Sequence, residues 1–277
     1  MIKKIIPLPI RRALGGGWGA WCAGRAKARL LRRLAGDRVQ CNVCGWQGAD
    51  FIGDAWHEGT ICPNCRSQVR HRLLVAALDG HSALPSLDQR AILAGRRVLH
   101  FAPERQLRQR IAQAAARYVT ADFARGDCDL RLDISRMSQI PAASFDVLIA
   151  CDVLEHVPDD HSAFREIARV LAPGGLAILT VPQKDSPSST DEDPGVVSEA
   201  EREARFGQKD HVRMYGDDFI HRLEAAGFEV ATLDRCSFPP DVVARHVLHP
   251  PRLNPSPLAT NQRRIYFARL RGVAPEN

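Results

Sequence analysis

The chain has 277 residues, of which 45% are hydrophobic and 25% are charged. These proportions are ordinary for a folded protein and exclude wholesale disorder and fibrous architectures. No segment approaches the roughly 18 consecutive apolar residues that a membrane-spanning helix needs, so a transmembrane protein is excluded as well. The length suits one large α/β domain, or a medium domain with a small appendage.

The positive charge is concentrated in an amino-terminal arm. The whole chain carries +6, whereas residues 1–38 hold ten basic side chains and one acidic side chain and therefore carry +9, which leaves −3 for the rest. Such an arm can bind anionic lipid headgroups, RNA phosphates or an acidic partner. Alternatively, it is a solvated tail that leads into a helix around residues 25–35.

The arm does not have the pattern of a cleaved export signal. Arg11 and Arg12 precede a stretch that is rich in glycine and only weakly hydrophobic, and further basic residues follow at once. A cleaved signal is therefore not expected. We expect a cytoplasmic protein that the arm can bring to the periphery of a membrane.

Two cysteine pairs predict a metal site. Each pair has the spacing Cys-x-x-Cys, and 17 residues separate the pairs. Each pair can turn a knuckle that points two thiolates at one position, so that two knuckles complete a tetrahedral sulfur site. Iron is the alternative metal, and two disulfides would require an oxidising compartment. The predicted zinc ligands are Cys41, Cys44, Cys62 and Cys65.

A small zinc ribbon is expected over residues 39–80. Gly45 suits the tight turn after the first cysteine pair, whereas Arg66 stands in the equivalent place after the second pair. His57 is a possible substitute ligand, but with four thiolates present it is expected to be a surface or packing residue. The segment has few large apolar residues, so a bound ion would supply folding free energy that a hydrophobic core of this size does not.

A cationic cluster follows the ribbon, at the start of a helix that is expected to run through Ala77. It consists of Arg66, Arg70, His71 and Arg72. The cluster either touches a phosphate or has a structural role at the junction of ribbon and helix.

From about residue 88 onward, strands and helices alternate. Strands joined by helical crossovers form a mostly parallel sheet whose ligand crevice lies at the carboxyl ends of the strands. We predict an α/β, Rossmann-like, doubly wound domain over residues 88–277, interrupted by a polar stretch at 182–207. The expected strands are 97–101, 118–121, 130–132, 145–150, 176–181, 228–233 and 264–270. The expected helices are 104–116, 161–171 (stopped by Pro-Gly-Gly at 173–175) and 218–227.

Two segments resemble the class I S-adenosylmethionine-dependent methyltransferases. Residues 145–158 read FDVLIACDVLEHVP and residues 169–175 read RVLAPGG, which is similar to the ubiquinone-biosynthesis type within that superfamily. Residues 206–216 (FGQKDHVRMYG) resemble a bacterial subgroup with an amino-terminal zinc ribbon. The resemblance covers residues 95–235 and the last strand. It implies a seven-stranded sheet with an antiparallel last strand, which binds S-adenosylmethionine at the ends of its first, second and fourth strands.

The resemblance also implies donor-binding residues at the strand ends. Asp122 ends the second strand, eighteen residues after Glu104, which is close to the offset of about 20 expected for an acid that accepts ribose hydroxyls. The alternative for Asp122 is a loop aspartate that caps a turn. Asp133 and Ile134 match the family's contact with adenine. Cys151 lies where the backbone of the family usually touches the cofactor.

The first strand-to-helix turn departs from the family, which usually has a glycine-rich turn there. This chain has His-Phe-Ala-Pro-Glu at residues 100–104. Phe101 and Ala102 take the place of the glycine-rich backbone, and Pro103 removes an N–H donor. Glu104 is a candidate partner for the α-ammonium group of the cofactor. The departure leaves a catalytically inactive relative as an alternative.

Methyl transfer is an in-line displacement that needs alignment, exclusion of water and sometimes a base. His156, just beyond the fourth strand, is a candidate base, or else a histidine bonded to backbone at a helix start. His211 is a second candidate base, and Arg213 is a candidate for holding an anionic acceptor. Together with Tyr215 they lie where the family often forms one wall of the acceptor pocket. Alternatively, these three side chains tie down a loop.

Three classes of function follow. The first is a methyltransferase that acts on a small molecule or on a glycan- or lipid-linked acceptor. The second is an RNA methyltransferase that grips phosphates with the zinc ribbon and the basic arm, although the body of the chain is slightly acidic. The third is an inactive binding module that keeps the fold.

Overall fold

The computed structural model describes residues 24–53, 58–82, 92–185 and 189–271. The first 23 residues of the predicted arm, His57, and residues 88–91 at the start of the predicted Rossmann-like domain lie outside the described residues. Residues 24–33 form a helix, as the sequence predicts for the end of the arm. Within the described ranges, no helix is long and apolar enough to cross a bilayer.

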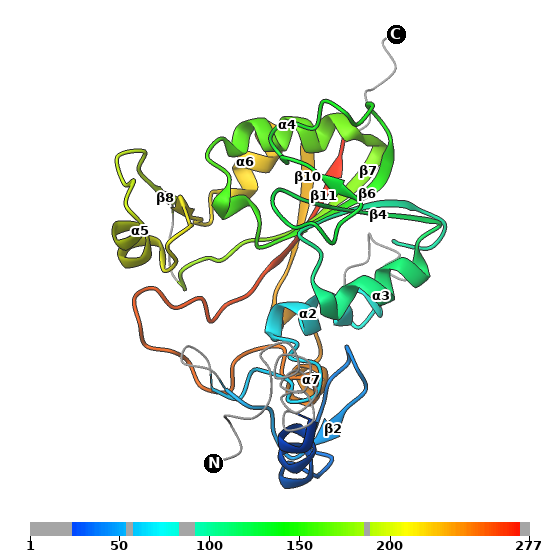
Figure 1. Cartoon of the computed structure of the whole chain (residues 1–277), viewed down its shortest axis with the longest axis vertical. Helices are drawn as coiled ribbons and strands as arrows, with labels where there is room; N and C mark the ends of the chain where they lie inside the picture. The colour runs from blue at the N-terminus through cyan, green and yellow to red at the C-terminus, as the bar shows by residue number, and fades with distance from the viewer. Residues whose placement is uncertain (1–23, 54–57, 83–91, 186–188, 272–277) are drawn as a thin grey trace, which may run out of the picture.

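A seven-stranded sheet forms the centre of the fold (Figure 1). Its strand order is β10-β11-β7-β6-β3-β4-β5, and β11 alone runs antiparallel to its neighbours. This topology confirms the predicted Rossmann-like class, including the antiparallel last strand. The strands are β3 (Arg97–Phe101), β4 (Arg117–Asp122), β5 (Leu130–Arg131), β6 (Phe145–Cys151), β7 (Leu171–Thr180), β10 (Phe228–Leu233) and β11 (Ile265–Leu270).

Helices cover both faces of the sheet, because its central strands are apolar on both sides. On one face, Phe164 and Phe219 pack α4 and α6 against the sheet. On the other face, Leu74 and Leu107 pack α2 and α3 in a second apolar core. These helices are α2 (Val69–Leu78), α3 (Arg105–Ala114), α4 (Asp160–Val170) and α6 (Phe219–Ala225).

The junction of α4 and β7 differs from the prediction. The helix ends at Val170, and β7 begins directly at Leu171, so that residues 173–175 lie within the strand and do not stop the helix. The pairing register with β6 shifts between Phe145 and Val147, opposite this segment. Gly174 has φ +72°, a conformation that glycine adopts without steric cost, and this lets the strand bulge.

The polar stretch also contains regular structure, which its polar composition did not predict. Helix α5 (Glu199–Phe206) lies within it, and β8 (Asp191–Glu192) pairs with β9 (Arg213–Met214). Ser198 accepts from the backbone of Glu201 at 3.2 Å, and the Glu201 side chain reaches back to Ser198. This capping box has the local sequence signal S-x-x-E, which could have revealed the helix.

Two knuckles shape the segment that precedes α2. Strands β1 (Val39–Gln40) and β2 (Gln47–Gly48) flank the first knuckle. Gly45 N donates to Cys41 O at 2.8 Å, and Arg66 N donates to Cys62 O at 2.9 Å. Gly45 and Arg66 have φ +75° and +66°, so the arginine accepts the same left-handed backbone as the glycine.

The connection between β10 and β11, residues 234–264, returns to the knuckles and carries α7 (Pro240–His246). Figure 1 shows α7 between α2 and the helix at residues 24–33. His246 Nδ1 donates to Gln40 O at 2.9 Å, and Arg72 Nε donates to His246 O at 2.7 Å. The cysteine-bearing segment is therefore held against the sheet by α2 on one side and by α7 on the other.

Candidate functional site

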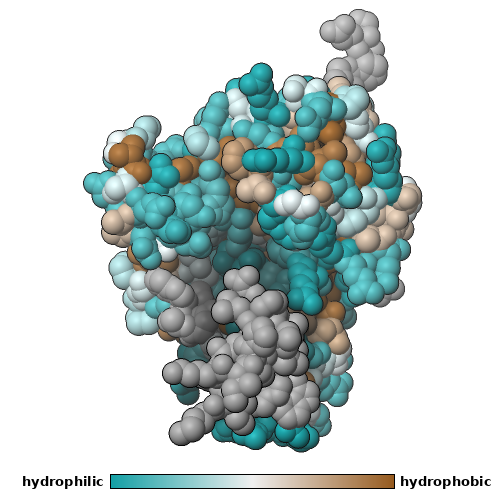
Figure 2. All heavy atoms as spheres, in the orientation of Figure 1, coloured by the Kyte–Doolittle hydropathy of each residue, from teal (hydrophilic) through white to brown (hydrophobic). Residues whose placement is uncertain are grey.

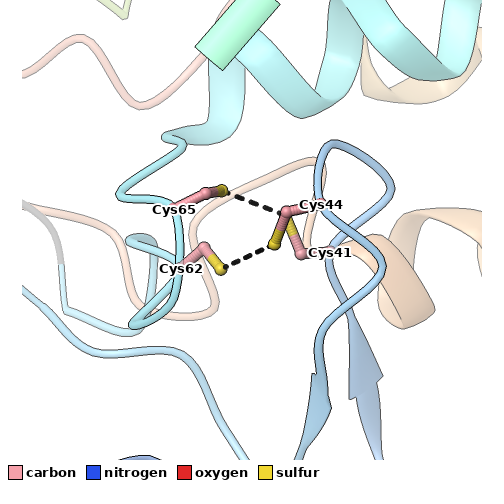
Figure 3. A group of neighbouring side chains, drawn as sticks. All are labelled: Cys41, Cys44, Cys62 and Cys65. Atoms are coloured by element: carbon pink, nitrogen blue, oxygen red, sulfur yellow. Dashed lines mark hydrogen bonds between the residues drawn. The ribbon is translucent and has the colours of Figure 1, made fainter. Parts of the chain in front are cut away.

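The four predicted zinc ligands converge on one point (Figure 3). Cys41 Sγ lies 3.7 Å from Cys65 Sγ, Cys44 Sγ lies 3.8 Å from Cys62 Sγ, and all four sulfur atoms are within 4.8 Å of one another. A tetrahedron with metal–sulfur bonds of about 2.3 Å has sulfur–sulfur edges of about 3.8 Å, whereas a disulfide bond measures about 2.05 Å. The residues present therefore fit a tetrahedral metal ion.

A buried arginine lies beside the cysteines. Arg72 is 0% exposed and forms no ion pair with a carboxylate among the described residues. Burial lowers the pKa of Arg72 to about 10, against the opposing effect of the neighbouring cysteine thiolates. All five of its N–H groups donate, to the carbonyl oxygens of Thr60, Ser67, His246 and Val247 and to the Ser67 hydroxyl.

Ser67 connects this cation to the cysteine cluster. Its hydroxyl lies 3.2 Å from Cys41 Sγ and 3.5 Å from Arg72 Nη1. Hydrogen bonding to Cys41 and Cys62 lowers the pKa of Cys44 to about 6, whereas hydrogen bonding to Cys44 raises the pKa of Cys41. Without a cation, the cluster therefore holds thiols together with thiolates. A metal ion and the Arg72 charge would both favour the fully ionised set.

A cavity of about 450 Å³ lies at the carboxyl end of β6. The start of α2 forms one wall, and segments within residues 206–214 and 250–263 form the others. The face seen in Figure 2 is mainly hydrophilic and is hollowed near its centre. The cavity lining includes Arg70, Asp152, Glu155, His156, His211 and Arg263.

Asp152 joins three distant segments at this cavity. Its carboxylate accepts from Thr180 Oγ1 at 2.9 Å and from Arg263 Nη1 at 3.3 Å, and Arg70 Nε lies 3.3 Å away. Burial opposes ionisation, but the charges of Arg263 and Arg70 outweigh it and hold the pKa of Asp152 at about 2. Asp152 also has φ +52°, an uncommon conformation for a residue other than glycine.

His211 presents an unprotonated nitrogen at the cavity. Its Nδ1 lies 3.1 Å from Phe206 O, and a carbonyl oxygen only accepts, so Nδ1 carries the proton. The other nitrogen, Nε2, is buried without a hydrogen-bond partner among the described residues. Burial lowers the pKa of His211, which keeps the ring neutral near pH 7. The side chain is thus suited to accept a proton.

His156 and Glu155 lie next to His211. The two imidazole rings meet edge to face with centroids 4.8 Å apart, and His156 Nδ1 lies 3.3 Å from Asp210 O. Glu155 is 1% exposed, and burial raises the pKa of its carboxyl group. One ligand atom from each of Glu155, His156 and His211 falls within 4.8 Å of the others, so these three side chains could hold a divalent cation.

The residues expected to bind the donor do not line this cavity, but they cluster at the neighbouring strand ends. Phe101 is buried in β3, and Ala102 has φ +44°, a left-handed backbone at the place where the family has glycine. Glu104 is the N-cap residue of α3, and its Oε2 lies 3.2 Å from His100 Nε2. Cys151 ends β6, and burial raises the pKa of its thiol, so the thiol stays protonated.

Asp122 and Asp133 both accept hydrogen bonds in local turns. Asp122 Oδ1 accepts from the backbone of Ala124 and Arg125 at 2.8 Å, which is the turn-capping alternative. Within the described residues no hydrogen bond reaches Asp122 Oδ2. Asp133 Oδ1 accepts from Ser135 N at 2.8 Å. Ile134, which follows Asp133, is buried.

Arg213 and Tyr215 lie behind the cavity, in the protein interior. Arg213 donates to the carbonyl oxygens of Leu154, Val157 and Pro158 in and after the 3₁₀ turn η2 (Leu154–His156), and to Glu192 Oε2 at 2.9 Å. Tyr215 is 0% exposed and donates to Asp160 Oδ2 at 2.8 Å. Their polar groups tie down the loop, which is the alternative that the sequence left open for them.

Three residues at the cavity were not singled out from the sequence. Asp152 and Glu155 lie inside the segment that resembles the methyltransferases, so the motif itself was a signal that could have found them. Arg263 lies next to the last predicted strand, and nothing in the local sequence points to its contact with Asp152.

The family comparison covers the central part of the chain. Residues 90–179 match the family described as a methyltransferase domain. The chain is also similar to the 27-O-demethylrifamycin SV methyltransferase of Amycolatopsis mediterranei (strain S699), with 39% identity over 93 residues. That match covers 32% of this chain and 31% of the relative, so the similarity spans about a third of the length of the curated relative.

The chain is also similar to solved structures of low sequence identity. An S-adenosylmethionine-dependent methyltransferase from Mesorhizobium loti has 19% identity and a TM-score of 0.45, with 69% of this chain and 99% of that chain covered. The 1,6-didemethyltoxoflavin-N1-methyltransferase of Burkholderia thailandensis has 15% identity and a TM-score of 0.43, with 73% and 87% covered.

The strand order and the crevice at the strand ends define a Rossmann-like, doubly wound architecture. Within it, residues 90–179 are the part of the chain that matches the methyltransferase-domain family.

Proposed function

We propose that this protein transfers a methyl group from S-adenosylmethionine to a hydroxyl group of a small-molecule acceptor, or of a glycan- or lipid-linked one. The observation that carries this proposal is the unprotonated Nε2 of His211 at a cavity beside the end of β6. A volume of about 450 Å³ falls within the range of small-ligand pockets. The domain match at residues 90–179 supports the choice of donor.

The donor supplies a methyl group that is already activated on a sulfonium sulfur. The chain has to align the acceptor oxygen, exclude water and remove one proton. The oxygen–carbon bond forms as the carbon–sulfur bond breaks, the sulfur keeps the electron pair, and His211 Nε2 takes the proton. Asp122, Asp133, Ile134, Glu104 and the backbone at Phe101, Ala102 and Cys151 are the proposed donor contacts.

Transfer of a labelled methyl group tests this function. Full-length protein is incubated with labelled S-adenosylmethionine and with RNA, sugar-nucleotide or lipid-linked fractions. We expect label in a sugar-nucleotide or lipid-linked fraction, and a large loss of transfer in His211→Gln but not in His221→Gln, whose side chain is 79% exposed. Label in RNA alone would favour the RNA alternative. The absence of both transfer and donor binding would favour an inactive module.

The same proposal includes a structural zinc ion on Cys41, Cys44, Cys62 and Cys65. It rests on the sulfur–sulfur distances of 3.7 and 3.8 Å and on the buried Arg72, which forms no ion pair with a carboxylate within the described residues. Four thiolates and one divalent ion carry a net charge of −2, which a buried guanidinium offsets in part. Metal analysis is expected to find one zinc per chain in the purified protein and none after Cys62→Ser.

A further inference from the structure

The first turn of α2 reaches the donor side of the sheet from the cysteine-bearing segment. Arg70 Nε lies 3.3 Å from Asp152 Oδ2, just after β6, and His71 Nε2 lies 3.7 Å from Glu104 Oε1, just after β3. Both residues follow Cys65 closely in the chain. The segment that carries the cysteines therefore supplies two side chains to the crevice where β3 and β6 end.

Three polar atoms in this crevice are buried without a hydrogen-bond partner among the described residues. They are Arg70 Nε, His71 Nε2 and Glu104 Oε1. Buried polar groups in folded proteins are nearly always paired, with protein, water or a ligand. The 3.7 Å between His71 Nε2 and Glu104 Oε1 is too long for a hydrogen bond, although the two atoms face one another.

The chemistry of each atom is fixed by its neighbours. His71 Nδ1 accepts from Gln68 N at 2.9 Å, so the neutral ring carries its proton on Nε2, which is a donor. Burial lowers the pKa of His71 to about 4, so the ring is neutral at physiological pH. Glu104 is held by His100 through Oε2, and its Oε1 is left as an acceptor. The crevice thus offers two N–H donors, one of them cationic, and one carboxylate oxygen.

Arg72, on the same helix, has a purely structural role and serves as a comparison for Arg70. All five of its N–H groups are matched by oxygen acceptors, and its side chain is 0% exposed. Arg70 instead lines the cavity, keeps 23% of its side chain exposed and leaves Nε without a hydrogen bond. Arg70 therefore has an N–H group at the cavity that is available to bind a ligand.

We infer that Arg70 and His71 complete the site for the amino-acid end of the donor, with their N–H groups on its α-carboxylate and Glu104 on its α-ammonium group. This inference rests on the proposed function. A zwitterion matches the two donors and the acceptor, whereas a plain phosphate would leave Glu104 facing an anion. The cysteine-bearing segment is then part of the donor site as well as a support for the fold.

Calorimetry with two product-like ligands tests the inference. S-adenosylhomocysteine carries the amino-acid end, and 5′-methylthioadenosine lacks it but keeps the adenosine. We expect the full-length, zinc-loaded protein to bind S-adenosylhomocysteine more tightly. Arg70→Gln is expected to weaken that binding about 10- to 100-fold and to leave 5′-methylthioadenosine binding unchanged. Arg105→Gln, an exposed arginine next to Glu104, is the matched control and should change neither.

The outcomes separate this inference from the proposed function. Equal losses for both ligands in Arg70→Gln, or no loss for either, would overturn the inference while the donor assignment stands. Equal affinity of the unaltered protein for both ligands would overturn it too. If the unaltered protein binds neither ligand, the proposed function fails and the inference fails with it. Zinc content and the melting temperature of each variant verify that the fold is intact.

Discussion

The guanidinium of Arg72 lies over the ring of Phe51, with 4.4 Å between its central carbon and the ring centroid. Both side chains are buried, and Phe51 packs in one apolar cluster with Cys41 and Cys62. A cation over an aromatic face is stabilised by the charge distribution of the ring. The contact therefore keeps a positive charge next to a site that would carry −2 with zinc bound.

Arg72→Met is expected to lower the free energy of unfolding by about 3–5 kcal/mol and to weaken zinc binding, since it removes the compensating charge and the hydrogen bonds that the guanidinium donates to four carbonyl oxygens. Denaturant unfolding in the presence of zinc and a competition assay with a chelator measure the two effects. Arg66→Met, at an exposed position of the same segment, is the control. Equal stability of the two variants would contradict this account of Arg72.

Zinc binding is expected to weaken as the pH falls. The metal binds thiolates, so protons compete with it, and acidification shifts the competition toward the thiols. The pKa of Cys44 is about 6 in the metal-free cluster, and that of Cys41 is raised, so binding at neutral pH releases protons. Release of zinc to a colorimetric chelator, followed from pH 8 to pH 4, measures the effect. A pH-independent affinity would contradict a thiolate site.

His211→Gln is expected to lower the rate of methyl transfer by about 10²–10⁴-fold, the usual contribution of a general base. Because burial lowers the pKa of His211, the base is unprotonated at neutral pH, and activity should fall only on the acid side of the ordinary histidine range. The pH–rate profile of the unaltered protein measures this acid-side fall in activity. The residual activity of the variant should not show the same fall. If the variant keeps the acid-side fall in activity, a group other than His211 is responsible for it.

Asp152→Asn tests the junction of the three segments. The pKa of Asp152 is lowered to about 2, so its ion pairs stabilise the fold above its ordinary pKa near 4, and this stability is lost as the pH falls through 2. The variant should be less stable by about 2 kcal/mol at pH 7, and the difference should shrink as the pH falls from 4 toward 2. Melting temperatures measured across this range check the trend. A constant difference would mean that the carboxylate charge is not the cause.

Asp122→Asn separates the two roles of this residue. The amide oxygen can still accept from Ala124 N and Arg125 N, so the turn is kept, while the second oxygen is replaced by a donor. If Asp122 binds the ribose, S-adenosylhomocysteine should bind about 10-fold more weakly. An unchanged dissociation constant, with an unchanged melting temperature, would leave Asp122 as a turn cap alone.

The fold was predictable where a signal is local and repeated. The run at 145–150 is apolar at nearly every position, and this is the pattern of β6, a strand buried on both faces. The start of β7 was not predictable, because the bulge opposite residues 145–147 depends on strand pairing. Helix α5 was not predicted for a different reason. Its capping box is present in the sequence, but the surrounding polar residues are typical of a loop.

The candidate site divides in the same way. The spacing of the cysteines brings their sulfur atoms together, because each knuckle is built from a few consecutive residues. The contacts of Asp152 with Arg70 and Arg263 join positions 82 and 111 residues away, and no spacing rule encodes them. The hydrogen bonds of Arg213 also depend on the tertiary fold, since the carbonyl oxygens to which it donates belong to another segment.

The return of the chain to the cysteine knuckles has a consequence for the order of folding. Arg72 meets His246 O and Val247 O, which are 174 and 175 positions later in the chain. The knuckles can close on a metal early in synthesis. The two carbonyl oxygens that hold Arg72 in place become available only when most of the polypeptide has left the ribosome. Contacts of such long sequence separation form slowly. A nascent chain that stops before α7 would therefore expose an incompletely supported cysteine cluster.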